Sequence, residues 1–496
     1  MRLNIRNKII ELIPTIIEGI TYAQNAESHL AIQVLDDCIN AISSIFNSLE
    51  SGLSENRISF YAIKINSIIE KIMQMKTFVN NGQNTKEISY KIENLIISLK
   101  GSLLDESEVK LEIVFLPYKS SMWDSMESIW RAAKDDPRCN CHVVPIPYYV
   151  NTEKNDFSTL EYEGDNFNEE VPVTHFKDYD ISVKKPDIIY FHNPYDEYNT
   201  LTRVPTQYYS RNLVKYTNML VYCPYFVSMS YSLNKDDKIN NFYKMPGIYN
   251  SHKVICQSVA FSNFLTGFGF DSSNLLTYGS PKIDSVIYNL HNKNYNIPKE
   301  WIKKLQGKKV FLLNTKIFHF SIKGQETVED LENLIHSIID NPNCALIWRP
   351  HPLARSGIKK YTPDLYNKYV KLEESVEKIE NCILDTTSTY LLSFILSDAL
   401  ISDGSSIINN YLITKKPIYH LEPYGSIKTF NYFTDPSAFY IDYLGTSITD
   451  FRDMILNDKD YNLHNRLKIT EDTFPNLDGK AGERIHSKIY DEVYKK

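Results

Sequence analysis

The spacing of apolar side chains changes once along this 496-residue chain, near Val109. Before that point Ile, Leu and Val recur three and four positions apart, for example over residues 32–49 and 58–78, which predicts amphipathic helices. After it, short β-branched or aromatic runs alternate with helical stretches, which is typical of βαβ units and a parallel sheet. The sequence therefore predicts an all-helical module over residues 1–105, followed by α/β structure.

The α/β part is long enough for two lobes. One series of strands and helices closes near Gly279, and a second series begins with the apolar run at residues 309–313. A ligand cleft is expected between two such lobes. The expected divisions are the helical module, for packing, oligomerisation or docking, then a first lobe over 106–290, a second lobe over 291–475 and a closing helix over 476–496.

Composition narrows the classes of function. A net charge of −7 argues against a nucleic-acid binder, because phosphate recognition depends on clustered Lys and Arg. The chain lacks a Gly-x-Gly-x-x-Gly or P-loop motif, which argues against dinucleotide and ATPase chemistry. Seven scattered cysteines fit a reducing compartment better than a disulfide framework. Uncharged apolar runs of about 18 residues are missing, so the sequence predicts no membrane span, although contact with a membrane surface stays open.

Two segments could suggest a metal site. Cys139-Asn140-Cys141-His142 offers half of one, but no second Cys/His cluster completes four ligands at a familiar spacing. Asp178-Tyr179-Asp180 lies in an acidic, loop-like stretch and is interpreted as surface. We predict neither a metal nor an organic cofactor.

The most informative motif is Ser402-Asp403-Gly404-Ser405-Ser406, between a short apolar strand and a predicted helix. Small residues let the backbone approach a phosphate, and the first amides of a helix lack acceptors within the helix. The motif predicts a site for an anionic group, with an ordinary Ser/Asp helix cap as the alternative.

Polar side chains also end three other predicted strands. Arg349 and His351 follow an apolar strand directly, where open α/β sheets bind ligands. Arg can clamp a diphosphate and His can protonate a leaving phosphate, whereas the alternative is a solvated Arg and a turn His. The other two strand ends carry Asn314-Thr315-Lys316 with His319, and Gly279-Ser280-Pro281-Lys282 with Asp284. All four strand ends would converge on one cleft.

With these motifs in order, residues 250–490 resemble the CDP-glycerol:poly(glycerophosphate) glycerophosphotransferase family, of the teichoic-acid polymerase type. Its two specific matches are Ser402-to-Ser406 with Lys416-Pro417, similar to Ser-Asp-Tyr-Ser-Ser…Lys-Pro, and residues 478–484, similar to the family's C-terminal end. The weaker matches are Gly279-Ser280-Pro281-Lys282-Ile283-Asp284 to Gly-x-Pro-Arg-x-Asp, Asn314-Thr315 to Pro-Thr-Trp, and Arg349-Pro350-His351-Pro352 to the second histidine site.

The resemblance implies a GT-B-like pair of Rossmann-like lobes and a phosphotransfer reaction. An acceptor hydroxyl would attack the distal phosphate of a CDP-linked alditol, displacing CMP and forming a phosphodiester. His351 would assist the leaving group, while Arg349, Ser405 and Ser406 would neutralise the diphosphate. The expected donor-binding residues are Gly279, Lys282, Asn314, Thr315, Arg349, Asp403, Gly404, Ser405, Ser406 and Lys416.

The chain departs from the family at the expected catalytic base. The family carries a His-Gly motif in its first lobe, and the corresponding region here, residues 221–226, has no histidine. His192, at the end of another predicted strand, is the substitute, with Asp196 available to orient it.

Three functions stay open at this point. The first is a transferase that adds a phospho-alditol to a cell-surface glycan or polymer, with a cytidine nucleotide as donor. The second is a GT-B glycosyltransferase with a nucleotide-sugar donor, and the third is a non-catalytic scaffold. The expected location is cytoplasmic, at or near the inner face of the membrane, with homo-oligomers formed through the helical module as an option.

Overall fold

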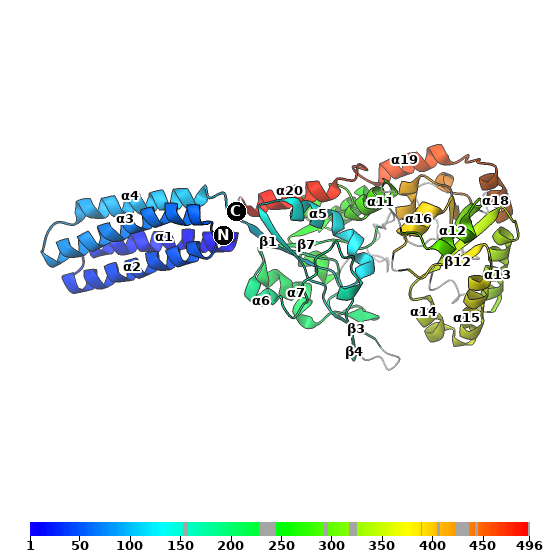
Figure 1. Ribbon diagram of the computed structural model, residues 1–496, viewed down its shortest axis with the longest axis horizontal. Helices are drawn as coiled ribbons and strands as arrows, with labels where there is room; N and C mark the ends of the chain where they lie inside the picture. Colours follow the sequence, from blue (N-terminus) through cyan, green and yellow to red (C-terminus); the bar gives the residue numbers. More distant parts are fainter. Residues whose placement is uncertain are drawn as a thin grey trace.

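The computed structural model describes residues 1–151, 157–227, 245–291, 296–316, 325–387, 389–403, 407–421, 436–441 and 445–494. Three parts follow one another along the long axis of the molecule: a helical bundle and two α/β lobes (Figure 1). The chain ends lie side by side, where the bundle joins the first lobe.

The bundle consists of α1 (Leu3–Ala23), α2 (Ser28–Glu50), α3 (Glu55–Asn80) and α4 (Lys86–Leu104). Each helix buries one stripe of residues, such as Ile9, Ile13, Ile16 and Ile20 on α1, which is the spacing that predicts helices. These side chains share one continuous core with the first lobe. The structure therefore confirms an N-terminal all-helical module, and it packs directly on the α/β part.

The first lobe is built on a six-stranded sheet with the order β2-β1-β5-β7-β8-β9, in which all neighbours are parallel. Every residue of β1 is buried, and its side chains alternate between two hydrophobic clusters. This burial on both faces explains why parallel strands are continuous apolar runs. The strands are β1 (Leu111–Leu116), β2 (Cys139–Val143), β5 (Ile188–Phe191), β7 (Met219–Tyr222), β8 (Lys253–Ile255) and β9 (Leu275–Leu276).

Short helices and a small antiparallel sheet complete the first lobe. The helices are α5 (Glu127–Asp135), α6 (Ile181–Lys184), α7 (Ser210–Leu213), α9 (Pro246–Tyr249), α10 (Val259–Gly267) and α11 (Pro281–His291), with the 3-10 turn η1 (Ser120–Ser125). The small sheet has the order β4 (Thr159–Glu161), β3 (Tyr148–Val150), β6 (Thr202–Arg203).

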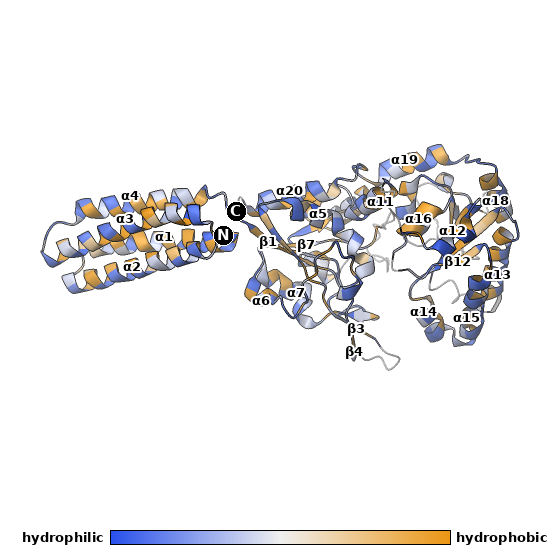
Figure 2. Cartoon of the chain, viewed as in Figure 1, coloured by the Kyte–Doolittle hydropathy of each residue, from blue (hydrophilic) through white to orange (hydrophobic). Residues whose placement is uncertain are grey.

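The second lobe is built on a five-stranded parallel sheet with the order β12-β11-β10-β13-β14. Figure 2 shows hydrophobic residues concentrated along its strands. The strands are β10 (Lys309–Thr315), β11 (Cys344–Pro350), β12 (Cys382–Leu384), β13 (Ala399–Ser402) and β14 (Ile418–His420). The helices are α12 (Lys299–Leu305), α13 (Gln325–Ile339), α14 (Ala354–Tyr361), α15 (Pro363–Lys378), α16 (Leu391–Leu396), α17 (Ile407–Tyr411), α18 (Ile448–Leu456) and α19 (Leu463–Thr473).

The last helix, α20 (Ala481–Tyr494), leaves the second lobe and returns to the first, where it packs on α5 (Figure 1). Gly482 makes this close approach possible, because a Cβ there would lie 2.3 Å from the carbonyl carbon of Ser128. The amide of Gly482 donates to the carboxylate of Asp284, 2.8 Å away. Among the described helices, none has both the length and the apolar character that crossing a membrane requires.

Candidate active site

Polar side chains form one row across the carboxyl ends of the second sheet. The strand register pairs Asn314 with both Arg349 and Ser402, and Ser402 with His420. Aligned residues of a parallel sheet point to the same face, here the face whose apolar residues cluster with Ile283 of α11. The sheet thus presents a polar edge toward the boundary with the first lobe.

His351 lies directly beyond this row, on a loop that is tied to the neighbouring strand. Its amide donates to the carbonyl of Thr315 at 3.0 Å, and its Nδ1 accepts from the amide of Leu353 at 3.1 Å. Because Nδ1 is an acceptor, the proton of the neutral imidazole sits on Nε2. Burial lowers the pKa of His351 below its ordinary value, so the neutral form dominates near neutral pH. His351 therefore offers an Nε2–H donor.

Asp403 is the acidic residue near several side chains at this end of the sheet. Its Oδ2 accepts from the amide of Lys316 at 2.7 Å. Burial lowers the pKa of Lys316, His351 and His420, and the charge of Asp403 opposes that shift in all three. His420, whose pKa falls to about 4, was not among the residues predicted for the site. Its position at a strand end was the one signal that could have identified it.

Arg349 is held within its own lobe. Its Nη1 contacts Asp385 Oδ2 at 2.7 Å and Thr387 Oγ1 at 3.2 Å, and its Nη2 donates to the carbonyl of Thr387 at 2.9 Å. Its own carbonyl accepts from Asn314 Nδ2 at 3.0 Å. The guanidinium would have to exchange some of these partners to clamp a diphosphate, so its contacts as they stand are structural.

Lys416, which was predicted to bind the donor, is bonded within the second lobe. Its ammonium donates to three backbone carbonyls at the end of α16, those of Phe394 at 2.7 Å, Ile395 at 3.1 Å and Ser397 at 2.6 Å. These bonds use all three N–H groups, and a cation at a helix C-terminus also complements the helix dipole. Lys416 thus caps α16, and its part in donor binding stays a prediction.

Gly279 and Thr315 have local structural roles. Gly279 has φ of +116°, and a Cβ there would lie 2.8 Å from Cβ of Ala481, so only glycine fits. Thr315 Oγ1 accepts from Trp348 Nε1 at 3.4 Å. Four residues of the sequence motifs, Gly404, Ser405, Ser406 and His319, lie outside the described part of the chain.

Lys282 lies at the boundary between the lobes. Its ammonium pairs with Asp124 of η1 and lies 5.3 Å from the ring centroid of Tyr390, a residue of the second lobe. The hydroxyl of Tyr390 donates to the same Asp124 oxygen at 2.9 Å. Asp124 and Tyr390 were not predicted for the site. They are 266 positions apart in the chain, so no local motif connects them.

His192 is fully buried and both of its ring nitrogens have partners. Nε2 accepts from the amide of Tyr118 at 3.0 Å, and Nδ1 lies 3.3 Å from Ser125 Oγ. Burial, and then the charge of Lys282, lower its pKa to about 3. Asp196, which was predicted to orient His192, accepts instead from the amide and hydroxyl of Ser210, at 2.7 and 2.9 Å.

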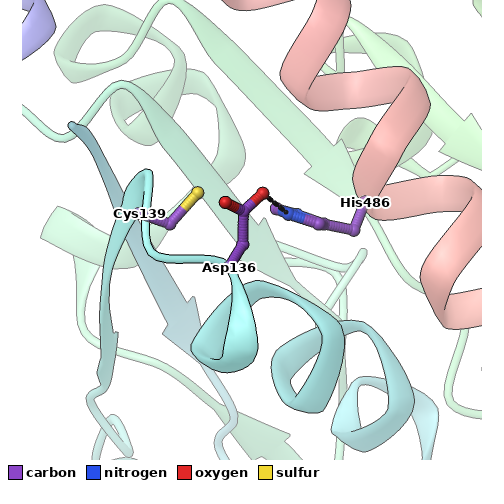
Figure 3. A group of neighbouring side chains, drawn as sticks. All are labelled: Asp136, Cys139 and His486. Atoms are coloured by element: carbon purple, nitrogen blue, oxygen red, sulfur yellow. Dashed lines mark hydrogen bonds and ion pairs between the residues drawn. The ribbon is translucent and has the colours of Figure 1, made fainter. Parts of the chain in front are cut away.

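A separate group of potential metal ligands holds α20 against the first lobe (Figure 3). One ligand atom each of Asp136, Cys139 and His486 lies within 4.8 Å of the others, and His486 Nε2 is 3.0 Å from Asp136 Oδ2. Arg138 donates to both oxygens of Asp136, at 2.9 and 2.7 Å, and its guanidinium lies 3.9 Å from the ring centroid of Tyr490. The guanidinium of Arg138 already pairs with the Asp136 carboxylate. These residues therefore connect α20 to the first lobe by hydrogen bonds and an ion pair.

Two parallel-sheet lobes, a C-terminal helix that returns to the first lobe and polar strand ends at the boundary define a GT-B-like protein, as predicted. The sequence profile of the family described as CDP-Glycerol:Poly(glycerophosphate) glycerophosphotransferase matches residues 229–491. The chain belongs to this family, which confirms the resemblance seen in its motifs.

Individual proteins similar to this chain include one curated relative and two solved structures. A teichoic acid poly(ribitol-phosphate) polymerase of Bacillus spizizenii is 24% identical over 259 residues, which are 48% of this chain and 37% of the polymerase. The chain thus spans well under half the length of that relative. The structure of the wall teichoic acid polymerase TagF is similar with a TM-score of 0.50 and 14% identity, over 86% of this chain and 98% of that one. A UDP-GlcNAc 2-epimerase of Neisseria meningitidis gives a TM-score of 0.48 at 12% identity, over 77% and 100%.

Proposed function

We propose that this protein is a transferase that takes a phospho-alditol from a CDP-linked alditol, such as CDP-glycerol, and adds it to a glycan or polyol-phosphate polymer, releasing CMP. Family membership supports the reaction class. The observation that carries the proposal is the contact between the Leu353 amide and His351 Nδ1, because it leaves Nε2 as the protonated donor nitrogen at the edge of the second sheet.

In the proposed reaction the oxygen of an acceptor hydroxyl bonds to the distal phosphorus as the bond from that phosphorus to the CMP oxygen breaks. The Nε2–H of His351 donates to the phosphate oxygen that accumulates charge, and Lys316 adds a positive charge near it. The donor side is the second lobe and the acceptor side is the first. The proton of the acceptor hydroxyl passes to solvent as the new bond forms. His192 is a poor base for it, since both ring nitrogens have partners inside the lobe.

The reaction is proposed to take place in the cytoplasm, where nucleotide-linked donors are made. All seven cysteines are free thiols, which supports a reducing compartment. The polymer substrate would meet the enzyme at the inner face of the membrane, and the helical bundle would serve docking or self-association.

The proposal is tested by incubating the full chain with CDP-glycerol, CDP-ribitol or a UDP-sugar and a polyol-phosphate acceptor, and measuring nucleotide release. We expect CMP release from a CDP-alditol and a phosphodiester in the product. His351→Gln should lower turnover about 10²- to 10⁴-fold, the usual contribution of a positioned proton donor. The matched control is His336→Gln, because His336 is exposed and pairs with Asp340 on the surface.

Other outcomes would replace the proposal. A glycosidic linkage with UDP release would indicate the glycosyltransferase. If CDP, CMP, UDP and GDP all fail to raise the melting temperature, the protein is a scaffold, because a ligand of the native state stabilises it by mass action.

A further inference from the structure

Helix α4 carries a row of exposed apolar side chains on its outer face. Tyr90 is 66% exposed, Ile97 is 56% exposed and Leu104 is 50% exposed, although all three side chains are large and hydrophobic. They follow one another at intervals of seven residues. Seven residues make almost two full turns of an α-helix, so the three side chains lie on one face. These three residues form the α4 stripe.

The α4 stripe is not part of the core of the bundle. Helix α4 packs against α1 and α3 and turns a different set of residues toward them, which includes Ile88, Ile92, Ile96, Leu99 and Leu103. Figure 1 shows α4 along an edge of the bundle, which projects from the lobes. Single exposed apolar residues are common, but an aligned row over about 21 Å of helix is typical of a surface that binds another protein.

Charged residues flank the α4 stripe on its side toward α1. Glu93 lies on that side, because its carboxylate accepts from the hydroxyl of Thr21 of α1 at 3.3 Å. Lys100 follows Glu93 at the same seven-residue interval, so it lies on the same flank. Both residues are partly exposed, and both charges are therefore available to a partner surface.

The opposite flank, toward α3, also carries one base and one acid. Ser98 is on this side, because its hydroxyl accepts from the ammonium of Lys64 of α3 at 3.2 Å. Lys91 lies seven residues before Ser98, and Asp105 lies seven residues after it, at the C-terminal cap of α4. Both are exposed. Lys91 pairs with Glu87 within the helix, and an exposed pair of this kind is worth little, so Lys91 can exchange it for another partner.

A second copy of α4 fits this pattern when it runs antiparallel, with Ile97 of both copies at a twofold axis. Tyr90 and Leu104 are equally far from Ile97 along the chain, so Tyr90 of each copy lies level with Leu104 of the other. This symmetry turns the same flank of both helices toward each other. Glu93 then lies level, within one residue, with Lys100 of the other copy, and this pair occurs twice.

The second flank gives the same result. Lys91 lies level, within two residues, with Asp105 of the other copy, which is about 3 Å along the helix. An antiparallel pair therefore brings opposite charges together on both sides of the apolar row. In a parallel pair, Glu93 and Lys100 of different copies would be about 10 Å apart along the axis and would not meet.

We propose that this protein forms a symmetric dimer in which the α4 stripes of two copies pack antiparallel about Ile97. A row of this length makes a small interface, and interfaces of less than about 1,200 Å² are weak. We therefore expect dimer and monomer to exchange at micromolar concentration. The lobes of the two copies would lie at opposite ends of the dimer, because each bundle projects from its own lobes. The inference does not rest on the proposed function, since α4 lies outside the candidate active site.

The dimer is tested by sedimentation velocity of the full chain between about 1 and 100 µM, the range in which a small interface dissociates. The main variant is Ile97→Glu, which places two carboxylates face to face at the axis. It should weaken the dimer about 100-fold or more, because like charges in an interface are strongly unfavourable. The matched control is Met73→Glu. Met73 is 57% exposed in the same bundle, and Lys76 beside it pairs with Asp36 of α2, so Met73 lies away from α4.

Exchanging the flanking charges tests the antiparallel register. Glu93→Lys and Lys100→Glu should each weaken the dimer about 3- to 10-fold, because each gives a chain with two like charges on this flank. An equal mixture of the two variants should form dimers again, since one chain then presents two lysines where the other presents two glutamates. Loss of a merely structural role in the bundle would not be repaired by mixing.

Several results would overturn the proposal. A wild-type chain that stays monomeric over the whole concentration range has no such dimer, and a dimer that Ile97→Glu leaves intact uses another surface. If the mixture of Glu93→Lys and Lys100→Glu stays monomeric, the antiparallel register is wrong. If the wild type is monomeric and sediments with vesicles of anionic lipid while Ile97→Glu does not, the α4 stripe binds a lipid surface instead.

Discussion

Arg349 and Asp385 form a buried ion pair, with 2.7 Å between Nη1 and Oδ2. Asp385 is 1% exposed and Arg349 is 7% exposed. Asp385 also accepts from the hydroxyl of Ser393, so the pair connects β11 to α16. A residue that the sequence marked as a phosphate clamp is thus part of the second lobe's internal framework.

Arg349→Ala should destabilise the second lobe by about 3–5 kcal/mol, because it leaves the Asp385 carboxylate buried without its partner. Denaturant unfolding measures the change, and Arg349→Ala combined with Asp385→Ala should recover part of the loss. A variant that unfolds like the wild type but no longer binds CDP would show that Arg349 is a clamp after all.

Gly279→Ala should be more destabilising than Gly269→Ala. Both glycines have positive φ, +116° and +90°, so both substitutions strain the backbone. At Gly279 the new Cβ also meets Ala481 of α20 at 2.8 Å, whereas at Gly269 nothing lies within 4 Å. We expect the melting temperature to fall several degrees further for Gly279→Ala, and equal shifts would contradict the close approach of α20.

His420 should make folding less favourable in acid. The pKa of His420 is about 4 in the folded protein, whereas its ordinary value, which applies to the unfolded chain, is 6.5. Between pH 4 and pH 6.5 the unfolded chain therefore binds a proton that the folded chain does not. Stability therefore falls as pH drops through this window, by about 2 kcal/mol at pH 5 for this one group. His420→Gln should reduce the loss of melting temperature between pH 7 and pH 5. The exposed His336→Gln is the control, and an unchanged slope in His420→Gln would place the effect elsewhere.

Zinc should not stabilise the Asp136, Cys139 and His486 group. Arg138 bonds both oxygens of Asp136, and burial raises the pKa of the Cys139 thiol, so the thiolate that zinc needs is scarce. We expect one equivalent of Zn²⁺ to leave the melting temperature unchanged. A zinc-dependent rise that Cys139→Ser abolishes would instead identify a metal centre that fastens α20.

Much of the fold could be predicted from the sequence, and less of the candidate site. The helical period before Val109 and the apolar runs after it indicated the bundle and the two α/β lobes correctly. The strand ends at Asn314, Arg349 and Ser402 do fall in one row, because parallel register aligns them. The contacts of Lys416 and Asp196 were not foreseen, since their partners are backbone groups and a serine that no motif reveals.

The sequence by itself determined the type of the main helices and strands and the family, because periodicity and motif spacing are properties of neighbouring residues. Only the tertiary structure decided which polar groups meet. Asp124 and Tyr390 share a hydrogen bond across 266 positions, and His486 of α20 meets Asp136, next to α5, across 350. Such partners depend on how distant segments pack, and a single sequence carries no local signal for that.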